Sequence, residues 1–456
     1  MLKSKKMGVF KLVMLSISAV VSLKSLPLFA EVGLSLIFFL LIAMLFFFIP
    51  ISMVIAELSS TWPSDEGCYY WIKKAYGKSV GFVVMWAYWM ESIIWFPTML
   101  IFIIAMLSHA LSPFFPNLEN NYYFFIIGII LIFWILTYIN CYGIEISSML
   151  SSIGVIIGTI IPILLIILFG IIWVLNDNEI NITFNVKSLI PDFNLNNLVF
   201  FSGILLGISG IEIISFHTHA IDNPKINIPK TVIISATIIF LIYLLGSLSI
   251  SIVVPKNEIS LASGVIQALK VFFIKNNIFF IIPILSVLLL IGSISGMNTW
   301  IMGPIKGMFV TSNDGFLPKY FKITNNKNIP VRLLIFQAIV GSSLSIIFFI
   351  FINNINGLIW VFICLSAQFA VFMYSIIFLS IIKLRKKYPH IKRPYKVPFL
   401  NLFSWLGISM CIFTFFISYI QPANINIIDK KIYILLLSAS FILLMLPSII
   451  FILKKK

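Results

Sequence analysis

The sequence predicts an all-α integral membrane protein with 12 transmembrane helices, and three observations lead to this prediction. The chain of 456 residues is 61% hydrophobic and only 10% charged, whereas a water-soluble domain is usually about half apolar and a quarter charged. It contains twelve apolar runs of membrane length. No interval between these runs is long enough for a soluble domain. The composition and the pattern together exclude a water-soluble globular protein.

Each predicted helix is an apolar run that can cross the hydrocarbon core, for which about 20 residues are needed. In chain order the runs are 9–29, 33–58, 79–110, 121–141, 147–175, 197–219, 230–254, 277–304, 331–353, 357–384, 400–420 and 431–453. The longest polar intervals, near 176–196, 255–276 and 311–330, have the length of loops. We therefore expect one polytopic domain over residues 1–456.

The basic residues predict the orientation of these helices. With a cytoplasmic N-terminus, 24 of the 31 Lys and Arg residues lie on the cytoplasmic side, six lie outside and Lys24 lies within a helix. Because cytoplasmic loops carry an excess of Lys and Arg, we expect both termini in the cytoplasm. The net charge of +16 does not indicate nucleic-acid binding, since the basic residues form short clusters between apolar runs.

The densest basic cluster follows the tenth run. Its members are Lys383, Arg385, Lys386, Lys387, Lys392, Arg393 and Lys396. We interpret the cluster as a signal that keeps this loop in the cytoplasm. A site for lipid headgroups or for regulation is the alternative.

The sixth run indicates a binding site inside the membrane. It carries Gly203, Gly207 and Gly210 and reaches Glu212, and a polar turn containing Asn223 follows. Lipid offers no water to solvate a charge or a freed backbone amide, so these residues are costly unless they have a role there. In transporters, helices broken near the middle of the bilayer present bare backbone groups to a charged substrate.

Three groups of motifs carry a resemblance to a known family. They are Ala56-Glu57-Leu58 with Trp62-Pro63, Glu66-Gly67 and Tyr69-Tyr70-Trp71; Gly210-Ile211-Glu212 with Asn223-Pro224; and Trp300-Ile301-Met302-Gly303-Pro304 with Asn313-Asp314-Gly315. With these motifs the chain resembles the amino acid–polyamine–organocation superfamily of transporters. Within it, the sequence is most similar to the bacterial glutamate/γ-aminobutyrate antiporters.

The resemblance implies a LeuT-type fold. Two inverted repeats of five helices would cover about 9–175 and 197–384, and two further helices would lie at about 400–453. The first and sixth helices would both be broken, and both runs do carry polar interruptions. Many relatives have Gly-Ser-Gly in the first break, whereas this chain has Val20-Val21-Ser22.

The resemblance also implies a function. It predicts a secondary active transporter of the bacterial inner membrane that exchanges amino acids or amines by alternating access. Its partners would be these small molecules and the lipid bilayer, a homodimer is compatible with the sequence, and no cofactor or enzymatic activity is expected. A proton- or sodium-coupled amino acid importer and a non-transporting amino acid sensor stay open as alternatives.

The candidate site residues fall into two groups by their expected role. Those expected to bind substrate are Val20, Val21, Ser22, Tyr88, Gly207, Ser209, Gly210 and Trp300. Those expected to couple or gate transport are Glu212, Lys24 and Glu91.

The three charged candidates each have a second interpretation. Glu212 can couple the broken helix to transport, or it can accept hydrogen bonds from exposed backbone amides. Lys24 can hold a substrate carboxylate or pair with Glu91 or Glu212, or it can reach outward to the level of Glu31.

Glu91 lies on one face of the third predicted helix with Tyr88, Ser92 and Trp95, because these residues are spaced three and four apart. This face can line the site, or it can be a packing face with one hydrogen-bonded carboxylate. Glu57 fits the cytoplasmic end of the second helix, where we expect it to order the following loop.

Metal binding is not expected. Cys68, Cys141, Cys364 and Cys411 are scattered and read as small apolar side chains. His217 and His219 form a His-x-His pair without a visible third ligand, and a helix would splay the two rings apart. We expect them to cap the end of the sixth helix.

Overall fold

The computed structural model describes residues 8–455 except 65, 143–153, 155, 214, 216–220, 276–277, 353, 424 and 426. This part of the chain is built from helices and their connections. The α-helices are α1 (Val9–Val20), α2 (Ser25–Ala30), α3 (Leu36–Ala43), α4 (Ile49–Thr61), α5 (Cys68–Tyr76), α6 (Lys78–Ala110), α7 (Tyr122–Cys141), α9 (Ile161–Leu175), α10 (Val186–Leu189), α11 (Leu195–Leu198), α12 (Phe200–Gly207), α13 (Pro224–Val253), α14 (Gly264–Lys275), α15 (Ile282–Asn313), α16 (Val331–Phe351), α17 (Ile355–Lys387), α18 (Leu400–Ile417) and α19 (Lys430–Lys455).

Short helical turns of other kinds complete the described elements. The 3₁₀ turns are η1 (Gly33–Ser35), η3 (Leu118–Asn120), η6 (Lys256–Glu258), η7 (Phe279–Ile281) and η8 (Lys319–Lys322), and the π-helical turns are η2 (Met44–Phe48) and η4 (Ile156–Ile160). The π-helical turn η2 joins α3 to α4, so that η1 to α4 form one long helical segment, Gly33–Thr61.

Eleven helical segments of the described chain are long and apolar enough to cross a membrane. They correspond to the second to twelfth runs predicted from the sequence, which confirms an all-helical membrane protein. The first predicted run, 9–29, forms the two shorter helices α1 and α2 instead of one long helix. Twelve crossings and the inverted repeat remain predictions.

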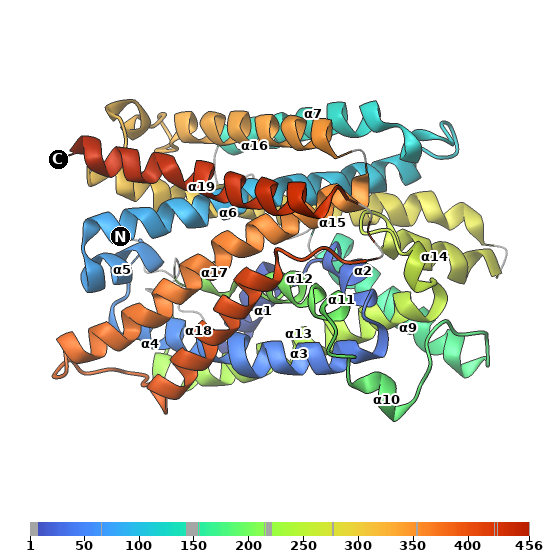
Figure 1. The fold of residues 1–456 in the computed structure, drawn as a ribbon, viewed down its shortest axis with the longest axis horizontal. Coiled ribbons are helices and arrows are strands. Elements are labelled where there is room, and N and C mark those ends of the chain that lie inside the picture. Colours follow the sequence, from blue (N-terminus) through green and yellow to red (C-terminus); the bar gives the residue numbers. More distant parts are fainter. Residues whose placement is uncertain are drawn as a thin grey trace.

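The long helices lie around a buried centre made by α6 and α17, which pack against each other, and α6 also packs against α15. The helix α19 is the most exposed of the long apolar helices, as expected for a surface that faces lipid. Figure 1 shows α5, the end of α17 and the end of α19 toward the left of the molecule, and α10 and α14 toward the right. The left side carries the loop after α17 and is the side that the sequence predicts to be cytoplasmic.

The interval 255–276, expected from the sequence as a loop, contains the helix α14. Val265, Leu269 and Phe272 are buried, and their spacing of four and three residues places them on one helical face. The interval is therefore an amphipathic helix that packs on the bundle.

Two helices approach so closely that only glycine fits between them. A Cβ atom on Gly158 of η4 would lie 2.1 Å from the backbone nitrogen of Gly292 on α15, and one on Gly292 would lie 2.1 Å from the Gly158 carbonyl oxygen. Small residues allow such close packing in membranes, where van der Waals contact drives helix association. This contact fixes the fifth predicted helix against the eighth.

The first and sixth predicted helices are both interrupted in the structure. The helix α1 ends at Val20, and α2 begins at Ser25. The helix α12 ends at Gly207, and Gly210 follows with a φ of +120°, a conformation that L side chains rarely adopt. The two interruptions frame the candidate site.

Candidate functional site

A cavity lies between the two interrupted helices. It holds about 1180 Å³ of space free of protein atoms, counting the part that opens to solvent. Besides both breaks, its wall includes residues of α6, α15 and α17. Ten of the eleven sequence-predicted site residues line it: Val20, Val21, Ser22, Lys24, Glu91, Gly207, Ser209, Gly210, Glu212 and Trp300.

Tyr88 is the candidate that does not line the cavity. It is fully buried on α6. Glu91, Ser92 and Trp95 of the same predicted face do line the cavity. The cavity therefore extends along this face only as far as Glu91. Tyr88, one helical turn earlier, is enclosed by neighbouring helices.

A tyrosine that the sequence analysis missed joins the two breaks. The Tyr243 hydroxyl of α13 lies 2.7 Å from the Val20 carbonyl oxygen and 2.9 Å from the Gly207 carbonyl oxygen, and it can donate its one hydrogen to either of them. It also accepts a hydrogen bond of 3.1 Å from the Ser22 backbone N–H. One side chain thus binds backbone groups that both helices leave free where they stop.

Glu212 is bound in a similar way from α17. The Gly210 N–H donates to the Tyr374 hydroxyl over 3.1 Å, and that hydroxyl donates to the Glu212 carboxylate. Glu212 is buried. The carboxylate therefore accepts from a side-chain hydroxyl, that of Tyr374, and it also lines the cavity. Its role in coupling stays a prediction.

Lys24 lies on the cavity wall. Its Nζ donates a hydrogen bond of 2.7 Å to Thr98 Oγ1 and lies 4.7 Å from the centre of the Trp95 ring. Among the described residues, no carboxylate lies within 4.0 Å of this Nζ. Of the interpretations given above, ion pairing at contact distance with Glu91 or Glu212 is therefore absent from this structure.

Glu91 faces the same cavity from α6. Ser92 Oγ lies 3.3 Å and Ser366 Oγ 3.4 Å from its carboxylate. Each hydroxyl has a closer acceptor, the Tyr88 carbonyl oxygen at 3.1 Å for Ser92 and the Glu91 carbonyl oxygen at 2.9 Å for Ser366. Trp95 and Trp300 stand beside each other on the cavity wall, with ring centres 6.1 Å apart. The cavity therefore combines charged groups with an aromatic wall.

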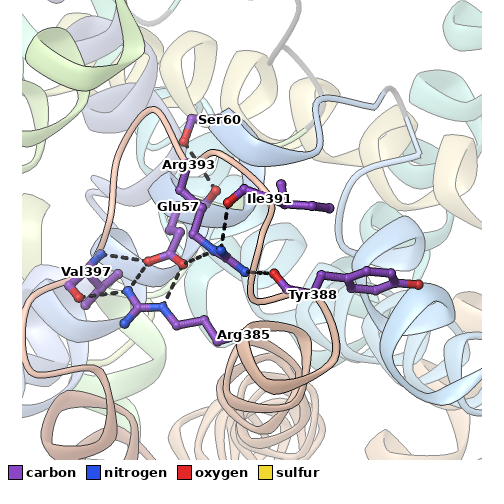
Figure 2. A network of polar contacts seen from close by, with 7 residues as sticks. All are labelled: Glu57, Ser60, Arg385, Tyr388, Ile391, Arg393 and Val397. Atoms are coloured by element: carbon purple, nitrogen blue, oxygen red, sulfur yellow. Dashed lines mark hydrogen bonds and ion pairs between the residues drawn. The ribbon is translucent and has the colours of Figure 1, made fainter.

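Glu57 lies away from this cavity and organises a different loop from the one expected. It is fully buried, and Figure 2 shows its carboxylate between Arg385, Arg393 and the backbone of Val397. Arg385 Nε donates over 2.8 Å, the Val397 N–H donates over 2.7 Å, and Arg393 Nε lies at 3.2 Å. Glu57 therefore holds the loop after α17, not the loop that follows α4. Arg385 and Arg393 of the basic cluster therefore hold this loop in place, in addition to the cluster's expected effect on membrane orientation.

A second charged cluster joins α5, α6 and the end of α15. The Asp314 carboxylate accepts from Lys73 and Tyr69, each over 2.6 Å, and pairs with Lys78 at 2.9 Å. Partial burial opposes ionisation of Asp314, but the hydrogen bonds from Lys73, Tyr69 and Lys78 outweigh it and lower its pKa below the ordinary value.

No group of three or more His, Cys, Asp or Glu side chains that could hold a metal occurs among the described residues. His217 and His219 lie outside the described residues. The cysteines are free thiols: Cys68, Cys364 and Cys411 are buried, and Cys141 is half-buried.

Comparison with known proteins extends these observations. A family model described as amino acid permease matches residues 7–445. An uncharacterized transporter of Legionella pneumophila is 38% identical over 93% of this chain and 91% of its own length. A glutamate/γ-aminobutyrate antiporter of Lactococcus lactis is 29% identical over 99% of this chain and 91% of its own. A probable agmatine/putrescine antiporter of the same species is 26% identical over 86% and 82%.

The family match covers nearly the whole chain and confirms the resemblance that the sequence motifs indicated. The apolar helices agree with it. The chain therefore belongs to the amino acid permease family, whose members are multi-pass membrane transporters and not enzymes.

Proposed function

We propose that this protein is a secondary active exchanger of amino acids or amines that works by alternating access in the bacterial inner membrane. The observation that supports it best is the cavity between the two interrupted helices, whose walls carry unwound backbone and three ionisable side chains. Relatives named as antiporters favour exchange over uptake driven by an ion gradient. Both termini would face the cytoplasm, and the inverted repeats would relate about 9–175 to about 197–384.

The helix ends provide the chemistry for an amino group. The helices α1 and α12 both end at the cavity, at Val20 and Gly207. The C-terminal end of a helix carries a partial negative charge and free carbonyl groups. A substrate ammonium group would bind there, while its carbon chain would lie against Trp95 and Trp300.

Opening and closing would involve the side chains that bind the breaks. Tyr243 of α13 binds Val20 and Gly207, and Tyr374 of α17 binds Gly210 and Glu212. A substrate that displaces one of these hydrogen bonds changes how the broken helices are held against their neighbours. Occupancy of the cavity is thereby linked to helix movement.

The test is counterflow in proteoliposomes containing purified protein. Labelled amino acids and amines are screened against internal glutamate, γ-aminobutyrate, arginine and neutral amino acids across pH 5 to 8. Uptake that requires an internal partner, and that is lost in Glu212→Gln, supports exchange and identifies the pair. Uptake into empty vesicles under an imposed proton or sodium gradient would replace the proposal with an importer. Binding without transport under every condition would indicate a sensor.

A further inference from the structure

The cavity carries one lysine, and an aromatic ring lies beside its amine. Lys24 is the one cationic side chain among the described residues that line the cavity, where Glu91 and Glu212 also lie. The Trp95 ring face, 4.7 Å from Nζ, attracts a cation through its quadrupole. This ring contact stabilises Lys24 when it carries its charge.

Thr98 gives the Lys24 amine a fixed hydrogen-bond acceptor. Thr98 Oγ1 donates its own hydrogen to the Trp95 carbonyl oxygen over 2.7 Å. Only its lone pairs are then left for Lys24, so the contact of 2.7 Å has Nζ as donor. Thr98 is buried, which fixes this acceptor in place. An ammonium group has three donors, and Thr98 takes one of them.

The two carboxylates of the cavity form no ion pair with Lys24 at contact distance. Glu212 accepts from Tyr374, whereas the hydroxyl groups of Ser92 and Ser366 beside Glu91 have closer acceptors in backbone carbonyl oxygens. In the described chain neither carboxylate lies within 4.0 Å of Lys24 Nζ. A partly desolvated lysine that lacks a carboxylate at contact distance gains more from an anionic ligand than an exposed lysine would.

We propose that Lys24 is a specificity-determining residue that selects substrates bearing a carboxylate over amines that lack one. The inference rests on the proposed transport function and narrows its substrate class. The proposed selectivity distinguishes the compounds named for the two antiporter relatives, because glutamate and γ-aminobutyrate carry a carboxylate whereas agmatine and putrescine carry none. The carboxylate of the substrate binds the Lys24 ammonium between Trp95 and Thr98, and the substrate amine binds at the ends of α1 and α12.

The experiment compares competitors of nearly equal length that differ at one end, which is a carboxylate in γ-aminobutyrate and a second ammonium group in putrescine. Counterflow of the best wild-type substrate is inhibited by γ-aminobutyrate or by putrescine, in wild type, Lys24→Met and Lys11→Met. Lys11 lies on α1, is exposed and does not line the cavity, so its variant is the matched control. Wild type and Lys11→Met are expected to favour γ-aminobutyrate at least about tenfold, and Lys24→Met is expected to lose about tenfold of that preference, equivalent to about 1.4 kcal/mol.

A comparison of glutamate with glutamine shows which carboxylate of the substrate binds Lys24. If the preference for glutamate over glutamine disappears in Lys24→Met, Lys24 binds the side-chain carboxylate. If that preference is unchanged and only the selection against putrescine is lost, Lys24 binds the α-carboxylate. Either result supports the inference. Equal preferences in Lys24→Met and Lys11→Met would overturn it and leave transport intact.

Two further readouts keep the inference testable if Lys24→Met does not fold. Thr98→Val keeps the shape of the side chain and removes the oxygen that holds Nζ, so it should shift the preference in the same direction by a smaller factor. The wild type alone also tests the inference, because a wild-type preference for putrescine over γ-aminobutyrate contradicts it. A wild type that transports and binds none of the compounds would remove the proposed function and this inference together.

Discussion

Glu57 of α4 and Arg385 of α17 form a two-pronged ion pair across 328 residues of sequence. The carboxylate is fully buried, and the guanidinium group also donates to the Val397 carbonyl oxygen over 2.8 Å. Because the Val397 N–H returns a hydrogen bond to Glu57, the loop is held on both its donor and its acceptor side. The pair therefore fixes the loop between α17 and α18 to the end of α4 (Figure 2).

Removing the charge of Glu57 should destabilise the protein more than it affects the cavity. Glu57→Gln leaves Arg385 and Arg393 without their buried partner, and breaking a buried pair costs about 3 kcal/mol or more. Thermal unfolding in detergent should show a clearly lower midpoint. Lys386→Gln is the control, because Lys386 is exposed in the same basic cluster. An equal midpoint for both variants would show that the pair contributes nothing to stability.

Tyr243→Phe should reduce transport at least about tenfold. The change removes the hydroxyl that binds both helix breaks and keeps the ring. Tyr433→Phe is the matched control, since the Tyr433 hydroxyl binds Ser418 and Trp360 and does not line the cavity. The control should lose about 1 kcal/mol of stability and keep its exchange rate per folded molecule. Similar rates for the two variants would contradict a role for Tyr243 in transport.

Tyr374 and Glu212 should behave as one unit. Tyr374→Phe and Glu212→Gln are each expected to slow exchange at least about tenfold, because the first removes the donor of their hydrogen bond and the second replaces its charged acceptor with a neutral amide. Residues that share a hydrogen bond are not additive, so the double variant should be little slower than the slower single variant. Initial counterflow rates of the four proteins measure this. Effects that simply multiply would show that the two residues act independently.

The glycine contact between η4 and α15 predicts a position-specific effect of one methyl group. Gly292→Ala places a carbon 2.1 Å from the Gly158 carbonyl oxygen and should cost about 2 kcal/mol through forced separation of the helices. Gly303→Ala is on the same helix with no atom within 4 Å. It should be neutral or stabilising, because alanine favours helix more than glycine by about 1 kcal/mol. Equal melting midpoints would refute the close contact.

Asp314 predicts a dependence of stability on pH. Its pKa is lower in the folded than in the unfolded protein, so its contribution is complete above the unfolded value of about 3.9 and is lost as the pH falls toward the folded value. Asp314→Asn should therefore lower the melting midpoint at pH 7 and pH 5, and the difference from wild type should shrink below pH 4. Asp192→Asn, an exposed control, should show no difference at any pH. A difference that grows at low pH would reverse the assigned sign.

The sequence predicted the parts of the fold that the lipid imposes. A crossing needs a certain length of apolar residues, so eleven long helices could be found from composition alone. The position of Glu212 and the glycines before it likewise stood out because they are costly in hydrocarbon. The break in the sixth helix lies where these residues indicated, and the break in the first helix lies where the family resemblance implied it.

The partners of these residues could not be predicted in the same way. Tyr243, Tyr374 and Arg385 reach their partners from helices distant in sequence, and nothing in their local sequence distinguishes them from other tyrosines or basic residues. Tyr88 shows a second limit of prediction from the sequence. Its spacing from Glu91 predicts a shared helical face, but how far a cavity extends along that face depends on the packing of neighbouring helices.

The Tyr243 hydroxyl has a single hydrogen for two carbonyl oxygens. It can make a full-strength hydrogen bond to Val20 or to Gly207, but not to both at once. The other carbonyl group then lacks this donor. In the proposed exchange cycle, rotation of this one O–H bond would change which helix break Tyr243 binds and which carbonyl group is left for a substrate ammonium group.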